Sequence, residues 1–138
     1  MTRRQTLKLA SWFLGLTLGA GSGSVFGQQA APTENKGITV KALTAVDLGP
    51  EIEGMGGRQL RMRMVTIDPG GVVGIHSHKD RPSTEFMLQG SIIDHRGGVA
   101  EEYRPGDTFS GDKDTMHWVE NKGTTPAVVI AVDVFKQP

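Results

Sequence analysis

Two histidines, His76 and His78, stand two residues apart in a stretch typical of a β-strand, and His117 follows in a second such stretch. Residues two apart in a strand share a face, so His76 and His78 can direct two imidazoles at one point. His117 can bring a third. Three convergent neutral imidazoles are a site for a divalent metal ion. The chain has four histidines, so this one site would use three of them.

The rest of the chain around these histidines consists of short strands separated by turns. Besides an alternating segment at 60–64, strand-like runs cover 38–43, 72–78, 84–88, 91–95, 99–104, 116–119 and 126–135. Glycine and proline mark the turns between them, which we place at 68–71, 96–98 and 105–107. Beyond the N-terminal region the apolar residues follow no helical period. The pattern predicts an all-β, single-domain fold, either an antiparallel sandwich or a small barrel.

The alternating segment also predicts which side chains face inward. Leu60, Met62 and Met64 alternate with Arg61 and Arg63. We expect the apolar set to be buried and the arginines to be solvated. Together with Met87, the two methionines fit the lining of a barrel, as core packing or, alternatively, as the wall of a substrate pocket.

The N-terminus is predicted to be an export signal over residues 1–27, followed by a flexible leader over 28–37 and the folded domain over 38–138. A basic start precedes a short apolar stretch, which is followed by small residues before Gln28. The segment Thr2–Lys8 resembles a twin-arginine signal, which implies export of a folded protein to the periplasm. A general secretory signal and an uncleaved anchor remain alternatives. The apolar stretch is too short and too rich in glycine for a typical membrane-spanning helix.

Charge and cysteine content exclude several functional classes. Cleavage after residue 27 removes three of the fifteen basic residues and none of the fifteen acidic ones, leaving a net charge of about −3. A mildly acidic domain without a basic stripe argues against nucleic-acid binding. The chain has no cysteine, so disulfide bonds and thiol chemistry are excluded.

Two motifs resemble those of the cupin superfamily and cover most of the predicted domain. The pattern G-x5-H-x-H-x4-E-x6-G fits from Gly70 to Gly90, and G-x5-P-x-G-x2-H-x3-N fits from Gly106 to Asn121. Both agree at every spacing. Ser83, Asp112 and Asp114 replace the Glu, Pro and Gly of the patterns.

This resemblance implies a jelly-roll β-barrel with a metal inside, held by His76, His78 and His117. The fourth family ligand is missing at Ser83. Glu85 lies two residues later, on the same face of a regular strand but about 6–7 Å farther along it. We interpret Glu85 as a candidate ligand, or as an acceptor that orients an imidazole, or as a carboxylate at a wet barrel mouth. The resemblance also implies a homodimer, in which the last strand, 127–135, could bury an edge.

The metal is not identified by these residues. Three histidines with a carboxylate and open positions suit six-coordinate Fe, Mn, Co or Ni. Three histidines with water suit tetrahedral Zn. The absence of the usual glutamate partly favours the second arrangement, tetrahedral Zn.

The leading functional hypothesis is a periplasmic, metal-dependent enzyme acting on a small oxygenated organic molecule, by dioxygenase- or isomerase-type chemistry. Glu85 would be a metal ligand or the general acid/base, and Arg81 would steer an anionic group. A non-catalytic metal- or small-ligand-binding protein is the alternative, and a metal-free structural barrel is a third.

Three further side chains are assigned structural roles. His95 precedes the turn at 96–98 and is expected to be exposed on a hairpin. Trp118 should face away from its neighbour His117, into sheet packing or a subunit contact. Asn121 is expected to bond backbone groups near a turn.

Overall fold

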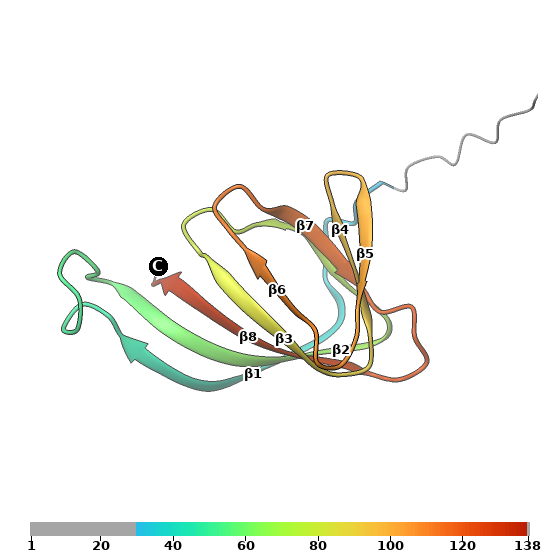
Figure 1. Cartoon of the computed structure of the whole chain (residues 1–138), viewed down its shortest axis with the longest axis horizontal. Coiled ribbons are helices and arrows are strands. Elements are labelled where there is room, and N and C mark those ends of the chain that lie inside the picture. Colours follow the sequence, from blue (N-terminus) through green and yellow to red (C-terminus); the bar gives the residue numbers. More distant parts are fainter. Residues whose placement is uncertain (1–29, 138) are drawn as a thin grey trace, which may run out of the picture.

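Eight antiparallel strands make up most of residues 30–137, the part of the chain that the computed structural model describes (Figure 1). The predicted export signal lies outside these residues. The strands are β1 (Lys36–Asp47), β2 (Arg58–Ser77), β3 (Ser83–Gln89), β4 (Ile92–Arg96), β5 (Val99–Tyr103), β6 (Thr108–Gly111), β7 (Met116–Glu120) and β8 (Ala127–Lys136).

The strands form one sheet that curls into a nearly closed barrel. Its order is β5-β4-β7-β2-β8-β3-β6, with β1 paired to β2 outside this path. The all-β, cupin-like barrel predicted from the sequence is therefore confirmed. Among the described residues no helix has the length and apolar character needed to cross a membrane.

Strand β2 connects the two halves of the sheet. Its first part, up to Ile67, pairs with β1 and β8, whereas its last part, from Val72, pairs with β7. The turn predicted at 68–71 is wrong, because these residues form an irregularity inside one continuous strand. Gly70 adopts a φ of 73° there, and its amide donates to the Asn121 carbonyl at 2.8 Å. The change of partners directs the C-terminal end of β2, which contains His76 and immediately precedes His78, into the barrel.

Two turn and strand assignments show where local sequence was informative. Gly97 and Gly98 both have positive φ angles, 54° and 83°, and they form the two-residue hairpin turn between β4 and β5 that the sequence predicts. The short strand β6 has no counterpart among the predicted strands. It pairs with β3 alone, and its four residues carry too little alternation to be recognised.

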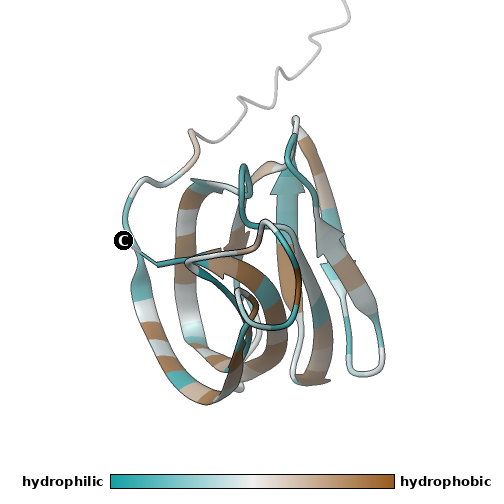
Figure 2. Cartoon of the chain, turned by 90° about the vertical axis from the view of Figure 1, so that its left-hand side faces the viewer, coloured by the Kyte–Doolittle hydropathy of each residue, from teal (hydrophilic) through white to brown (hydrophobic). Residues whose placement is uncertain are grey.

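The apolar core lies inside the barrel. Bands of apolar and polar residues alternate along the strands, as Figure 2 shows. Met87 is fully buried, which confirms its predicted packing role. It belongs to a buried cluster with Ile67, Ile92, Val119, Ala127 and Val129.

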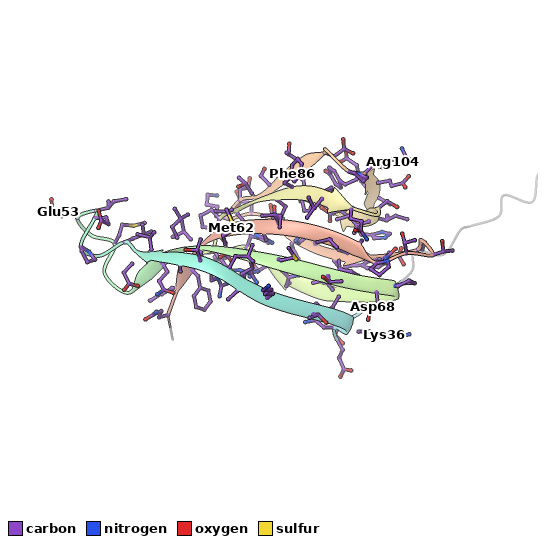
Figure 3. The ribbon with its side chains drawn as sticks, turned by 90° about the horizontal axis from the view of Figure 1, so that it is seen from below. Lys36, Glu53, Met62, Asp68, Phe86 and Arg104 are labelled. Carbon is purple, nitrogen blue, oxygen red and sulfur yellow. The ribbon has the colours of Figure 1, made fainter. Side chains whose placement is uncertain are left out.

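The predicted orientation of the segment 60–64 is wrong. Leu60 and Met62 are exposed, Met62 by 36%, and Figure 3 shows Met62 on the outside of the strands. Arg61 and Arg63 point inward instead. Asp133 on β8 faces them from inside the barrel and is paired in register with Arg61, so a buried countercharge outweighs the cost of turning arginines inward.

The predicted role of the last strand is also wrong. Strand β8 has hydrogen-bonded partners on both sides, β2 and β3, so it offers no free edge to a second subunit. Strand β1 has a partner on one side only among the described strands. The homodimer itself stays a prediction.

Residues 30–35, part of the segment predicted as a leader, lie against the C-terminal part of β2. The Ile75 amide donates to the Pro32 carbonyl at 2.7 Å. The Gly74 amide donates to Asn35 Oδ1 at 2.9 Å. A side chain at Gly74 would collide with the backbone at Thr33, so glycine permits this close approach.

Candidate metal centre

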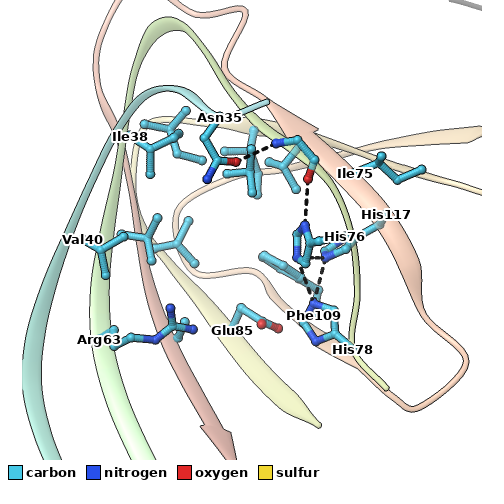
Figure 4. A pocket seen from close by; sticks show the side chains of 18 of the residues that line it. Asn35, Ile38, Val40, Arg63, Ile75, His76, His78, Glu85, Phe109 and His117 are labelled. Carbon is cyan, nitrogen blue, oxygen red and sulfur yellow. Dashed lines mark hydrogen bonds between the residues drawn. The ribbon is translucent and has the colours of Figure 1, made fainter. Parts of the chain in front are cut away.

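The three predicted histidines meet inside the barrel. His76 and His78 extend from the end of β2, and His76 is paired in register with His117 on β7. Their Nε2 atoms are 3.2 Å apart for His76 and His78, 2.9 Å for His78 and His117, and 3.1 Å for His76 and His117. Figure 4 shows them gathered on one wall of a cavity. Their predicted convergence is confirmed.

Each of the three rings is held from behind through its Nδ1 atom. His76 Nδ1 donates to the Gly74 carbonyl at 2.9 Å. His117 Nδ1 lies 2.8 Å from Asp94 Oδ1, and His78 Nδ1 lies 2.8 Å from Ser83 Oγ. Three different partners therefore fix the ring orientations and leave the Nε2 atoms directed at one point.

The partners also determine where the protons lie. A carbonyl and a carboxylate can only accept, so the Nδ1 atoms of His76 and His117 carry the hydrogens and their Nε2 atoms carry lone pairs. These two lone pairs face each other across 3.1 Å. One hydrogen on His78 Nε2 can point at one of them but not at both. The donor set therefore fits a cation, which would satisfy all three nitrogen atoms at once.

The electrostatics of the site keep the imidazoles of His76 and His78 neutral. Burial, with smaller contributions from His117, Arg81 and His76, lowers the pKa of His78 to about 4. Burial also lowers the pKa of His76. Because only the neutral ring can bind a metal, both rings are in the binding form at neutral pH.

Asp94 on β4 is a site residue that the sequence analysis missed. Its second oxygen accepts a hydrogen bond from Arg96 Nε at 2.7 Å. Burial alone would raise the pKa of Asp94, but the bonds to His117 and Arg96 outweigh burial and lower that pKa. Asp94 is thus an ionised, buried carboxylate behind a metal-directed imidazole. The only local signal was a lone carboxylate inside the apolar strand 91–95.

Ser83 and Glu85, the two residues considered for the missing family ligand, make different contacts. Ser83 is buried and supports His78 through its hydroxyl. Glu85 lines the same cavity, with Oε2 buried and without a hydrogen-bond partner. Burial raises its pKa. The cluster of potential ligand atoms within 4.8 Å of one another comprises the histidines and does not include Glu85. Its role as a ligand or as an acid/base stays a prediction.

A group of arginines lies around Asp133, and one of them, Arg63, lies across the cavity from the histidines (Figure 4). Arg61 binds Asp133 through two bonds of 2.9 Å, and Arg63 adds a third of 2.9 Å. Arg81, predicted to steer an anion, lies 3.7 Å from the same carboxylate and lines the cavity. Arg61 also stacks over the Phe135 ring at 3.8 Å. The sequence analysis missed Arg63 and Asp133, because it placed the arginines on the outer face.

The cavity between these walls has a volume of about 450 Å³. Apart from the charged and imidazole groups, most of its lining is apolar: Ile38, Val40, Val65, Ile67, Val73, Ile92, Phe109, Val119, Val129 and Ala131. Gly111 on β6 lies directly against the His78 ring, where any Cβ atom would overlap the imidazole. The space is thus large enough for a small organic molecule beside the histidines.

The remaining assigned side chains lie outside the metal centre. His95 is half-buried rather than exposed, because it stacks on Trp118 at 3.7 Å and bonds Glu120 at 2.8 Å. Trp118 is buried on the side away from His117. Asn121 donates to the backbone carbonyls of Ile67 and Thr125, as predicted.

Comparison with known families and proteins agrees with this geometry. A family model described as a cupin domain matches residues 63–133. The auxin-binding protein ABP19b of Prunus persica is 30% identical over 105 residues, which cover 71% of this chain and 48% of that protein. The oxalate-binding protein of Thermotoga maritima is 29% identical over 69 residues, covering 50% of this chain and 57% of that protein. The chain spans about half the length of the curated relatives it matches.

Solved structures share the fold at low sequence identity. A predicted oxalate decarboxylase from Thermotoga maritima superposes with a TM-score of 0.59 at 19% identity, over 78% of this chain and 96% of that one. KdgF from Halomonas sp. gives a TM-score of 0.58 at 18% identity, over 75% and 88%. At these identities the likeness concerns the fold alone.

Proposed function

The chain belongs to the cupin family, and from that premise we propose that it is a metal-dependent enzyme acting on a small oxygenated organic molecule. The observation that carries the proposal is the set of three imidazole Nε2 atoms within 3.2 Å of one another, two of which present lone pairs. A divalent ion bound there would act as a Lewis acid toward substrate oxygen atoms or would activate dioxygen.

The residues of this chain would prepare the site for that chemistry. Asp94, Ser83 and the Gly74 carbonyl orient the rings and so keep the three nitrogen atoms directed at the ion. The apolar lining excludes water around the reacting groups, which strengthens electrostatic interactions there. Dioxygenase-type and isomerase-type reactions are both compatible with this arrangement.

Glu85 is the candidate proton carrier. Its Oε2 atom is buried, has no hydrogen-bond partner and faces the cavity. Because burial raises the pKa of Glu85, this oxygen can hold a proton and release it to a substrate atom. Replacement by glutamine separates this role from that of a ligand. Turnover lost with metal content unchanged supports the acid/base role, whereas loss of metal supports ligation.

Metal content measured by elemental mass spectrometry tests the proposal. The protein would be purified from its native compartment without chelator or nickel resin. We expect a near-stoichiometric divalent metal in the wild type, lost in His76→Ala and His117→Ala. His95→Gln serves as the matched control, because His95 lies outside the site and should leave the metal in place. A wild type without metal, with a melting temperature unaffected by chelator, would sink the proposal.

A non-catalytic binding protein is the second candidate function. Two relatives support it by name, one as auxin-binding and one as oxalate-binding. A panel of oxygenated organic acids and alcohols, incubated with the metal-loaded protein, separates the two candidates. Product formation that disappears in His117→Ala supports the enzyme. Saturable binding without product across the panel supports the binding protein.

Export to the periplasm completes the proposed function. Its support is the basic, apolar and small-residue order of the N-terminal 27 residues. Cell fractionation of the wild type against a variant with Arg3 and Arg4 both changed to Lys tests it. We expect the wild type in the periplasm and the variant retained in the cytoplasm if the twin-arginine route is used. An unaltered distribution would indicate the general secretory route.

Self-association would use the outer sheet face rather than an edge of β8. Leu60, Met62, Phe86 and Leu88 are exposed there on β2 and β3. Exposed apolar side chains of this kind are typical of protein contact surfaces. Light scattering should give a dimer mass for the wild type and a smaller mass for Met62→Glu. A monomeric wild type would remove this part of the proposal.

A further inference from the structure

The arginine cluster carries more positive charge than the fold itself requires. Three guanidinium groups, from Arg61, Arg63 and Arg81, face the single carboxylate of Asp133, at N–O distances of 2.9, 2.9 and 3.7 Å. The Asp133 side chain is fully buried. Arg61 alone binds both of its oxygen atoms in a bidentate pair. Arg63 and Arg81 therefore bring two positive charges that no protein carboxylate at the cluster balances.

Arg63 lies at the cavity with part of its guanidinium unpaired. One terminal nitrogen binds Asp133, and its buried Nε atom has no hydrogen-bond partner among the described residues. The side chain lines the cavity and is 19% exposed, so a molecule in the cavity can reach it. Guanidinium groups with so few acceptors are uncommon at buried positions.

The nearest suitable protein group does not complete it. Glu85 lines the same cavity, and its Oε2 atom is also buried and without a partner. Within the described residues, no ion pair of 4.0 Å or less joins Arg63 to Glu85. Figure 4 shows Arg63 on one side of the cavity and the histidines on the other, with Glu85 between them in this view. Arg63 and Glu85 therefore line one cavity without pairing with each other.

We propose that Arg63, assisted by Arg81, binds the carboxylate of an organic acid whose other end reaches the histidine trio. This inference names the substrate class for the proposed function and therefore rests on it. The planar guanidinium offers donors in the fork that a carboxylate matches, and the ligand's charge balances positive charge that Asp133 alone leaves over.

The lining between the two walls defines the ligand further. Val40, Val65, Phe109 and Val129 surround this part of the cavity with apolar side chains. A compact dianion such as oxalate would place its second charge against this lining or leave Arg63 unpaired. A monocarboxylate whose apolar carbon body carries a hydroxyl oxygen at its far end matches all three zones, and we expect it to bind more tightly than oxalate.

Isothermal titration calorimetry with defined probes tests the inference. The probes are 4-hydroxybenzoate, 4-hydroxyphenylacetate and 3-(4-hydroxyphenyl)propanoate, each with its matched amide, and oxalate. Each is titrated into the metal-loaded protein and into the chelator-treated protein. We expect at least one arylalkanoate to bind ten-fold or more tighter than its amide and tighter than oxalate.

Variants assign that preference to Arg63. Arg63→Gln should reduce carboxylate affinity at least ten-fold while leaving amide affinity unchanged. Arg63→Lys keeps the charge without Nε and should fall between the two. Arg104→Gln is the control, because Arg104 pairs with Glu102 on the exposed surface and should bind like the wild type. If Arg63→Gln does not fold, the affinities for acid and amide are compared in the wild type and in Arg63→Lys. This comparison still tests whether Arg63 binds the carboxylate.

The outcomes separate this inference from the proposed function. Metal binding without a preference of acids over amides overturns the anion site and leaves the metal-dependent function standing. A preference of acids that persists in a protein unable to bind metal supports the anion site and removes the metal-dependent function. Equal carboxylate affinity in the wild type and Arg63→Gln overturns the assignment to Arg63.

Discussion

The two walls of the cavity, one with the histidines and one with Arg63, differ in the groups that they leave without a protein partner. On the histidine wall, neutral rings have every Nδ1 atom paired with a protein group, so only the convergent Nε2 atoms remain open. On the arginine wall, charged groups crowd around Asp133 and still leave Arg63 Nε without a partner. The proposed cation would complete the first wall, and the proposed anion would complete the second. Both proposals start from the groups that the protein leaves without a partner.

Removing the carboxylate that holds the arginine wall should have the largest effect. Asp133→Ala leaves Arg61 and Arg63 half-buried without their countercharge, and we expect a loss of about 3–5 kcal/mol in the free energy of unfolding. Urea unfolding measures it. Glu102→Ala removes the exposed partner of Arg104 and should cost less than about 1 kcal/mol. Equal effects of the two variants would show that the arginine wall needs no countercharge.

Weakening the support of the histidine wall should lower metal affinity without removing a ligand. Asp94→Asn keeps the size of the side chain but loses the charge behind His117, and we expect metal affinity to fall about 10–100-fold. Competition with a chromophoric chelator measures it. Glu120→Gln alters a carboxylate that bonds His95 outside the cavity and should leave affinity unchanged. An unchanged affinity in Asp94→Asn would contradict the role given to Asp94.

A single methyl group should displace one ring of the histidine wall. Gly111→Ala places a Cβ atom within the space of the His78 imidazole, and we expect about 2 kcal/mol of destabilisation together with weaker metal binding. Gly56→Ala is a matched control, since its Cβ atom would meet nothing within 4 Å. Thermal unfolding with and without metal compares them. Identical behaviour of the two variants would mean that His78 can move aside freely.

Acid should destabilise the metal-free protein through the same ring. The folded-state pKa of His78, about 4, lies below the usual histidine pKa of 6.5, so the unfolded chain takes up the proton first as the pH falls. The contribution is fully present above pH 6.5 and is lost as the pH falls toward 4. We expect a loss on the order of 1 kcal/mol, because water at the cavity mouth screens part of the effect. Unfolding followed between pH 7 and 5 should show a smaller slope for His78→Asn, and equal slopes would refute this explanation.

The histidine trio could be predicted because its spacing depends on local structure. His76 and His78 share a face in any regular strand, and the motif around His117 supplied the third ligand. Their supports could not be predicted in the same way. Asp94 comes from a neighbouring strand whose register is fixed only in the folded sheet, where it lies beside His117 through the pairing of β4 with β7. Local patterns identify ligands better than the groups that hold them.

The inward orientation of Arg61 and Arg63 was missed because an alternating pattern shows that two sets of side chains face opposite ways, but not which set faces inward. Leu60 and Met62 alternate with Arg61 and Arg63, and hydrophobicity alone turns the apolar set inward. The deciding group is Asp133, which lies far away in the chain and faces the arginines across β2 and β8. A lone aspartate in the otherwise apolar last strand, 126–135, was the available signal. A charged residue in such a strand is reason to look for its countercharge on the neighbouring strand.

The segment at residues 30–35 has a consequence for how the protein can be shortened. Asn35 holds the Gly74 amide, and the carbonyl of the same Gly74 accepts from His76 Nδ1. A chain trimmed to begin at residue 38 would retain every ligand and both motifs, yet it would lose the clamp on the residue that orients His76. We therefore expect the smallest unit that keeps His76 in place to begin before Asn35 rather than at the first residue of the predicted domain.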